Sequence, residues 1–162
     1  MLNNNDPIVI ELQRLRQQVN GLLQRERLAY VTGTWTPTCV GNSTAGVFTY
    51  SSQVGLYIQI ENLVYITGRV TISAIDTPPV GNMTIAGLPL NVNASYSPAF
   101  NFSIISNFNY SASALQLTAR FLPGATTIQL IETFDNSVAL QVPAANFTNA
   151  ACDLAFSGVY SL

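Results

Sequence analysis

Five carboxylates beyond residue 60 are the side chains of this sequence that could carry out acid–base chemistry. Two carboxylates on either side of a bound sugar can hydrolyse a glycosidic bond. No pair among the five has a spacing that would place both acids across one cleft. Asp76 and Asp135 stand in the turn-like stretches AIDTPPVGN and FDNS, where an Asp side chain bonds its own backbone. A structural role is therefore favoured over hydrolysis. The five are Glu61, Asp76, Glu132, Asp135 and Asp153.

Other kinds of catalytic site require residue types that this sequence lacks. It contains no histidine and no lysine. Ser-His-Asp and Cys-His nucleophiles, lysine Schiff bases and histidine metal sites are thereby excluded. Oxygen atoms of Asp135 and Asn136 could contribute to a calcium site, but no full set of ligands surrounds them at the required spacing. No Gly-rich phosphate loop is present either. We therefore expect no enzymatic activity, no cofactor and no metal.

The two cysteines, Cys39 and Cys152, lie near the two ends of the segment that follows residue 30. A disulfide would tie the first part of this segment to its last part. The alternative is a pair of small buried thiols, which is favoured in a reducing compartment.

Charge is scarce and unevenly placed along the chain. Charged residues make up 9% of the sequence, against roughly a quarter in average soluble proteins. Four of the six arginines lie in the first thirty residues, which leaves only Arg69 and Arg120 beyond them. Nucleic-acid binding requires clustered positive charge, so it is excluded as a function. The sequence shows no secretory signal and no apolar run long enough to span a membrane, so we expect a soluble protein made in a cytoplasm.

Residues 6–30 are predicted to form a helix with one apolar stripe. Asp6 and Pro7 form a favourable helix start. The stripe has spacings of 4, 3, 4 and 3, typical of a coiled-coil seam, although it covers little more than two heptads. So short a helix is marginal alone. The stripe must therefore pack on the chain's own β-domain or on copies of itself, and a break at Gly33, Trp35 and Pro37 favours copies. It consists of Ile8, Leu12, Leu15, Val19 and Leu22.

Residues 31–162 are predicted to be all β, with nine or ten short strands in a sandwich or jelly roll. Residues 54–60 and 63–72 alternate apolar and polar side chains on either side of Glu61–Asn62, which predicts a hairpin with one buried and one wet face. The predicted buried face carries Leu56, Ile58, Ile60, Val64, Ile66, Val70 and Ile72. Three later strands are predicted to point apolar side chains toward the core. The three sets are Phe100, Phe102 and Ile104, then Leu115, Leu117 and Phe121, then Ile128, Leu130 and Phe134.

Several apolar and aromatic side chains are candidates for binding at the surface of the β-domain. Ile105, Leu122 and Ile131 fall on predicted outer faces, and an uncharged face with scattered apolar groups often marks a protein interface. Three β-domains around a three-stranded stalk would bury such faces. A sugar-stacking surface could be formed by Tyr57, Tyr65, Tyr96 and Tyr110. Packing is the commoner role for aromatic residues at this spacing and is favoured here.

Several stretches together carry a family likeness. They are GTWTPT at 33–38, YSSQVGLYIQIENLVYITGRVTIS at 50–73, GNMTIAGLPL at 81–90 and SGVY at 157–160. Their order and spacing resemble the small β-domain of tailed-bacteriophage virion proteins, which occurs at tail-fibre and tailspike tips and in head fibres or decoration proteins. Residues 91–150 match only in their alternation, and Glu61 stands where Gly is expected in the turn.

The resemblance implies a trimeric, jelly-roll-like β-domain that follows a coiled-coil stem, with no catalysis. Trp35 and Pro37 would begin the first strand, with the indole wedged at the base of the β-domain. The implied protein is a virion component, a capsid decoration (cement) protein or short fibre attached through residues 1–30. Its partners would be copies of itself and other capsid or tail proteins. The residues assigned to oligomerisation or attachment are Ile8, Leu12, Leu15, Val19, Leu22 and Trp35.

Two other functions stay open at this point. A receptor-binding tail-fibre tip would recognise a host surface polysaccharide through Tyr, Asn and Ser side chains on outward loops. A glycan hydrolase would need one of the five carboxylates and is disfavoured.

Overall fold

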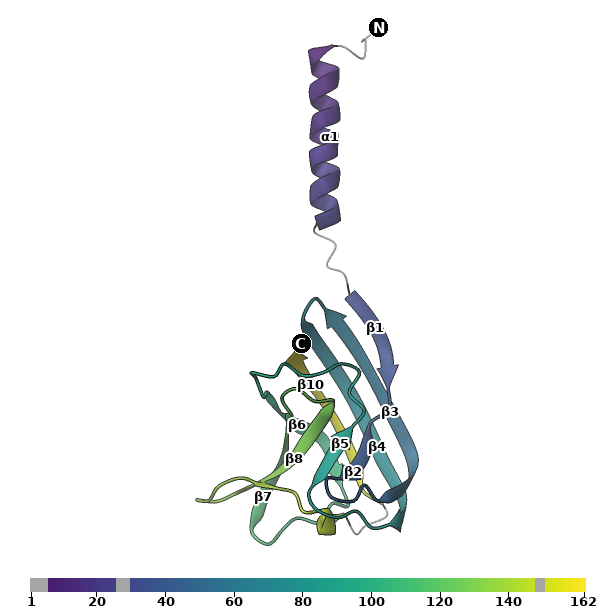
Figure 1. Cartoon of the computed structure of the whole chain (residues 1–162), viewed down its shortest axis with the longest axis vertical. Helices are drawn as coiled ribbons and strands as arrows, with labels where there is room; N and C mark the ends of the chain where they lie inside the picture. Colours follow the sequence, from purple (N-terminus) through teal and green to yellow (C-terminus); the bar gives the residue numbers. More distant parts are fainter. Residues whose placement is uncertain (1–5, 26–29, 148–150) are drawn as a thin grey trace. The chain divides into compact units, whose positions relative to one another are not determined.

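The structure, a computed structural model, describes residues 6–25, 30–147 and 151–162, with the side chains of residues 22–25 excepted. The chain divides into two compact units, Met1–Tyr30 and Val31–Leu162 (Figure 1). Each unit is described by itself. In the described residues, no helix is long and apolar enough to cross a membrane.

The first unit contains one helix, α1, which spans Pro7–Arg25. Its start is the predicted one, because the Asp6 carboxylate oxygen Oδ1 accepts a hydrogen bond from the backbone N–H of Ile8 at 3.0 Å. This is the bond expected of a helix-capping Asp. The predicted end at residue 30 is wrong, since Tyr30 already belongs to the first strand. Residues 26–29 lie outside the described part.

The second unit is one antiparallel sheet of ten strands, so the prediction of a mainly β protein after an N-terminal helix is confirmed. The finer predictions of a jelly roll and of a coiled coil stay predictions. A 3-10 helix, η1, spans Ala144–Asn146. The strands are β1 (Tyr30–Trp35), β2 (Thr38–Gly41), β3 (Val47–Ile60), β4 (Leu63–Thr77), β5 (Met83–Ala86), β6 (Ala99–Ser106), β7 (Ala114–Phe121), β8 (Thr127–Phe134), β9 (Leu140–Gln141) and β10 (Asp153–Ser161).

The strand order shows how the sheet is folded. Along the sheet it reads β1-β3-β4-β10-β6-β7-β8-β5-β2, with β9 paired to β8. Its two ends, β1 and β2, are consecutive in the chain and are joined only by Thr36 and Pro37. The two edges must therefore come close together, and the sheet has to curl around its own inner face (Figure 1).

The curled sheet encloses one hydrophobic core to which both halves contribute. β4 supplies Val64, Ile66, Val70 and Ile72, as predicted, and all four are buried. The opposite half supplies Met83 and Ile85 from β5 and Ile128 and Leu130 from β8, and these also belong to the same cluster. Phe121, Phe156 and Tyr160 fill the space towards β6, whose Phe100 lies against Phe121 and Phe156 with ring centroids 4.9 and 5.7 Å away.

Trp35 lies in this core, at the point where β1 passes into β2. Its side chain is 7% exposed, and its Nε1–H donates to the Thr67 carbonyl oxygen at 3.0 Å. The indole lies over two glycines that face each other across β3 and β4, Gly55 and Gly68. A Cβ atom on Gly55 would lie 2.5 Å from the indole Nε1, so only glycine leaves room for this ring. The prediction that Trp35 begins the first strand is wrong, because it ends that strand.

The predicted burial of the β3 face is also wrong. Tyr57 pairs with the buried Ile66, and Ile58 pairs with the exposed Tyr65. Tyr57 therefore shares the inner face of β4 and packs against the core. Leu56, Ile58 and Ile60 point outward and are 54%, 40% and 40% exposed. The cause is the two-residue turn, which puts Ile60 opposite Leu63 and so on the outer face.

Two register shifts change which side chains of β6 and β7 point toward the core. The pairing of β6 with β10 skips Ser103, so Ile104 is exposed while Ile105 turns to the core. The pairing of β7 with β8 skips Leu115, which is 68% exposed although it was predicted to be buried. Bulges of this kind shift the alternation by one residue. The predicted outward position of Ile105 is therefore wrong, while Leu122 and Ile131 are half-buried and their interface role stays a prediction.

Replacement of Trp35 by Ala is expected to lower the free energy of unfolding by about 3–5 kcal/mol, because it leaves a large cavity over Gly55 and Gly68. Urea denaturation followed by circular dichroism measures this loss. Leu115→Ala is the matched control, since its exposed side chain is expected to change stability by less than about 0.5 kcal/mol. Equal stability of the two variants would contradict the assigned role of the indole.

Candidate interaction surfaces

The first candidate surface is the apolar stripe of α1. On the helix by itself, the side chains of Ile8, Leu12, Leu15 and Val19 are between 46% and 64% exposed. Leu22 continues the spacing, but its side chain lies outside the described part of the structure. Between these positions the helix carries Gln and Arg side chains, and Arg14 forms an ion pair with Glu11 at 3.2 Å. The structure thus places these four side chains on one side of α1, as the sequence predicts, while the exposed Ile10 lies on another side of the helix.

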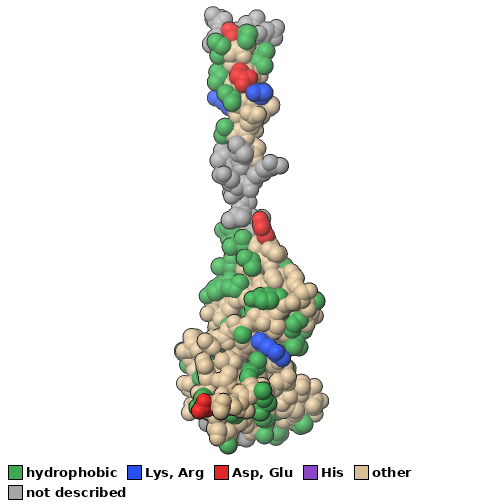
Figure 2. Space-filling view, turned by 90° about the vertical axis from the view of Figure 1, so that its left-hand side faces the viewer, with side chains coloured by type: hydrophobic (Ala, Val, Ile, Leu, Met, Phe, Trp, Pro, Cys, Tyr) green, Lys and Arg blue, Asp and Glu red, His purple; other side chains and the backbone are tan. Residues whose placement is uncertain are grey.

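A second apolar surface lies on the outer face of the sheet and is called here the hairpin patch. It comes from three neighbouring strands: Ile58 pairs with Tyr65 between β3 and β4, and Tyr65 pairs with Val159 between β4 and β10. Together the side chains line a shallow hollow of about 390 Å³. Figure 2 shows hydrophobic side chains gathered at the end of the β-unit that is uppermost in that view. The patch consists of Ile58, Ile60, Leu63, Tyr65 and Val159.

All five side chains of the hairpin patch are exposed to a similar degree, between 40% and 52%. They point away from the core, so the chain's own packing does not account for them. Their neighbours on the same face continue the pattern, since Val54 and Leu56 of β3 are 55% and 54% exposed. An uncharged, contiguous apolar surface of this kind is typical of a protein interface.

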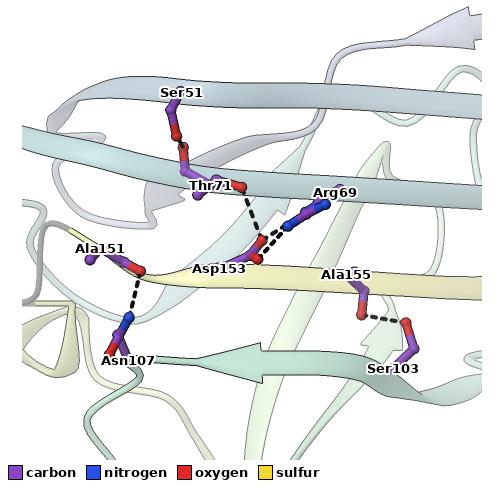
Figure 3. A network of polar contacts seen from close by, with 8 residues as sticks. All are labelled: Ser51, Arg69, Thr71, Ser103, Asn107, Ala151, Asp153 and Ala155. Carbon is purple, nitrogen blue, oxygen red and sulfur yellow. Dashed lines mark hydrogen bonds and ion pairs between the residues drawn. The ribbon is translucent and has the colours of Figure 1, made fainter.

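Further along the same face, a polar network joins β4 to β10 (Figure 3). The Asp153 carboxylate accepts hydrogen bonds from Arg69 Nε at 3.0 Å and from a terminal Arg69 nitrogen at 2.7 Å. It also accepts one from the Thr71 hydroxyl at 3.0 Å. These bonds, the Arg69 pair first, hold the pKa of Asp153 below its usual range, against the opposing effect of partial burial. The hydrogen bonds to Asp153, and its negative charge, raise the pKa of the Arg69 guanidinium.

The network continues to the strands on either side. The Ser51 hydroxyl donates to the Thr71 carbonyl at 3.3 Å, and the Ser103 hydroxyl donates to the Ala155 carbonyl at 3.1 Å. Asn107 donates to the Ala151 carbonyl at 3.1 Å (Figure 3). The charges of Arg69 and Asp153 neutralise each other, and the hydrogen bonds of the network connect neighbouring strands of the sheet. It therefore fastens β3, β4, β10 and β6 to one another.

The five carboxylates lie in different parts of the fold and do not share one set of contacts. Asp76 accepts a hydrogen bond from the Thr49 hydroxyl at 2.8 Å, and Asp153 is held by Arg69. Glu61 and Asp135 lie exposed in turns. Glu61 has a φ of 53°, the left-handed conformation that explains why Gly is expected at this position. In the described residues, no cluster of three His, Cys, Asp or Glu side chains could hold a metal ion.

Glu132 is the one carboxylate of the five that is fully buried. The alternation of Ile128, Leu130 and Phe134 places position 132 on the same inner face, and this is the signal that could have indicated its burial. Its Oε1 accepts hydrogen bonds from the Ser111 backbone N–H at 2.9 Å and from the Asn146 side chain at 3.2 Å. Within the described part of the chain, its Oε2 has no hydrogen-bond partner. The bonds of Oε1 fasten the turn before β7 and η1 to the centre of β8.

Both cysteines are free, buried thiols. Burial raises the pKa of the Cys39 thiol, with a smaller effect from Cys152. Burial also raises the pKa of Cys152 to about 12, with the charge of Asp153 as the second cause. Protonated, buried thiols are poor nucleophiles and behave as small apolar side chains.

The four tyrosines considered for sugar stacking do not form one surface. Tyr57 and Tyr65 lie on opposite faces of the sheet, because Tyr57 packs against the core while Tyr65 belongs to the hairpin patch. Tyr96 lies in the segment before β6, and Tyr110 packs against Phe108 with ring centroids 5.0 Å apart. Trp35 was assigned to oligomerisation or attachment, and the structure places it in the core.

Comparison with known proteins gives a similarity of fold. No family model matches the sequence, and no curated protein matches it. The crystal structure of the Dettilon tailspike protein (gp208) is similar to this chain, with a TM-score of 0.66 and 21% sequence identity. The similarity covers 82% of this chain and 24% of the tailspike chain, so this chain spans about a quarter of that protein's length. At this identity the two share a fold, and function does not follow from it.

Replacement of Asp153 by Asn is expected to destabilise the β-unit at neutral pH and to have little effect in acid. The folded state lowers the pKa of Asp153 from its usual 3.8. The carboxylate therefore contributes stability above pH 3.8, and this contribution is lost as the pH falls through the lower folded pKa. Urea midpoints of the wild type and the variant at pH 7, 5, 4, 3 and 2 measure the difference, which should shrink below pH 4.

The matched control is the same substitution in an Arg69→Gln background. Without the guanidinium, Asp153→Asn should change the urea midpoint much less at pH 7. A difference between wild type and Asp153→Asn that persists unchanged at pH 2 would show that the carboxylate acts by shape rather than by charge.

Proposed function

We propose that this protein is a structural component of a phage virion, a non-enzymatic homotrimer that assembles through α1. It serves as a capsid decoration protein or short fibre and attaches through its N-terminal segment. The observation that carries the proposal is the exposed apolar stripe of α1, Ile8, Leu12, Leu15 and Val19. Complete burial of each such side chain contributes roughly 1.5–3 kcal/mol. Packing against the same stripe of other copies would provide this burial, because side chains at heptad spacing form one seam along the helix.

The virion assignment is supported by two observations of different kinds. The motifs between residues 33 and 90 resemble the small β-domain of phage virion proteins, and the fold is similar to part of a tailspike protein. Three copies are the number that this resemblance implies.

A non-catalytic role is supported by the surroundings of the carboxylates. The hydrogen bonds of Asp76 and Asp153 go to β3 and β4, and those of Glu132 go to the segment before β7 and to η1. Glycosidic hydrolysis needs two carboxyl groups facing one another at about 5–10 Å across a bound sugar. The bonding of these side chains is that of structural residues.

Substitution of the α1 stripe is expected to dissociate the trimer. Leu12→Asn together with Leu15→Asn places two polar side chains in the seam, and the mass in sedimentation equilibrium should fall from three chains to one. The control is Gln13→Asn together with Gln17→Asn, which introduces the same residue on the polar side of the same helix and should leave three chains. A three-chain mass for the stripe variant would show that α1 does not hold the copies together.

The virion role has a separate test. Mass spectrometry of gradient-purified particles of the phage that encodes this chain should detect the protein in a copy number divisible by three. Purified wild-type protein should rebind to particles that lack it, and the stripe variant should not. Absence of the chain from purified particles would contradict the proposal even if the protein is a trimer.

A further inference from the structure

We infer that the hairpin patch is a second contact between copies of this chain, at which the β-units of neighbouring subunits meet. The inference rests on the proposed self-association through α1. The patch joins Ile58 and Ile60 of β3, Leu63 and Tyr65 of β4 and Val159 of β10 into one uncharged surface. The side chains of all five are at least 40% exposed on a single chain.

The course of β1 places the patch at the end of the sheet where the chain enters the β-unit. Gly33 lies against the ring of Tyr57, and Trp35 lies against Gly55. As β1 advances, its contacts on β3 therefore move backward along the chain, so β1 is antiparallel to β3. Val31, at the start of the unit, must then lie near the end of β3 that carries Ile58 and Ile60.

The length of the connecting segment ties this end of the sheet to the α1 bundle. α1 ends at Arg25 and the second unit begins at Val31. Six residues span at most roughly 20 Å when fully extended. Copies that are bundled through α1 must therefore have their Val31 residues within that distance of the end of the bundle. The patches of all copies are brought close together by this constraint, which favours a second copy as the occupant.

Charge also favours a second copy over a lipid surface. Binding to anionic lipids uses exposed Lys or Arg side chains next to the apolar surface. Arg69, the cation on this outer face, is bonded to Asp153 through two nitrogens. The patch itself contains no charged residue, so identical copies do not repel one another across it. Glu61, in the turn beside the patch, is exposed and can stay in water at the rim.

The test compares polar substitutions in the full-length protein. Ile58→Asn together with Leu63→Asn should raise the concentration at which the trimer dissociates by about tenfold or more, because apolar area is lost from the contact. Sedimentation velocity over a dilution series measures it. Leu115→Asn, on β7 and away from the patch, is the control: its side chain is 68% exposed, and the substitution should leave dissociation unchanged. Unchanged dissociation of the patch variant would overturn the inference.

The same substitutions in the Leu12→Asn and Leu15→Asn background separate assembly from folding. In these single chains the side chains of Ile58 and Leu63 are 40% and 52% exposed and lie outside the core, so their replacement should leave the β-unit folded, with a cooperative thermal unfolding transition. Loss of the cooperative transition there would mean that the patch is needed for folding of the single chain and would contradict the inference.

Other outcomes are distinguishable. A wild-type protein that is a single chain at all concentrations would overturn the proposed assembly and this inference with it. A wild-type trimer with an unaffected patch variant would overturn the inference alone. Co-sedimentation of wild type, but not of the patch variant, with phosphatidylcholine or phosphatidylglycerol vesicles would show that the patch binds lipid rather than a second copy.

Discussion

The whole β-unit depends on the two-residue link between β1 and β2. Because Thr36 and Pro37 alone join strands at opposite ends of the strand order, the sheet cannot lie open. It has to curl until its edges approach, and the enclosed space must be filled. Trp35 fills it at the link, over the glycine pair Gly55 and Gly68. The indole hydrogen bond to Thr67 then fastens the link to the middle of β4.

This closure has a consequence for the outer surface. Both halves of the curled sheet contribute to one core cluster, and the exposed apolar side chains on the outer face of β3, β4 and β10 lie outside it. The Arg69–Asp153 network fastens one end of that face by polar bonds within the sheet. The other end carries the hairpin patch. The patch and the stripe of α1 are thus two apolar surfaces that the described chain leaves exposed.

Much of this could be predicted from the sequence, and the errors have identifiable physical causes. The capped start of α1 and the buried face of β4 follow from local patterns, and both are confirmed. The β3 face was assigned by its apolar content, but the two-residue turn fixes register and reverses that assignment. The exposure of Leu115 depends on a register shift, which no alternation pattern reveals. The alternation of β8 places Glu132 on the inner face, but its hydrogen-bond partners Ser111 and Asn146 are distant in sequence and no local pattern reveals them.

The most direct test is the native mass of the unmodified full-length protein, measured by light scattering coupled to size exclusion over a range of loading concentrations. A mass of three chains at every loading concentration is the predicted result, since the stripe of α1 then has the partners that its spacing requires. A mass of one chain would mean that the stripe is covered within the chain itself. The trimeric virion component would then have to give way to a monomeric binding or decoration module.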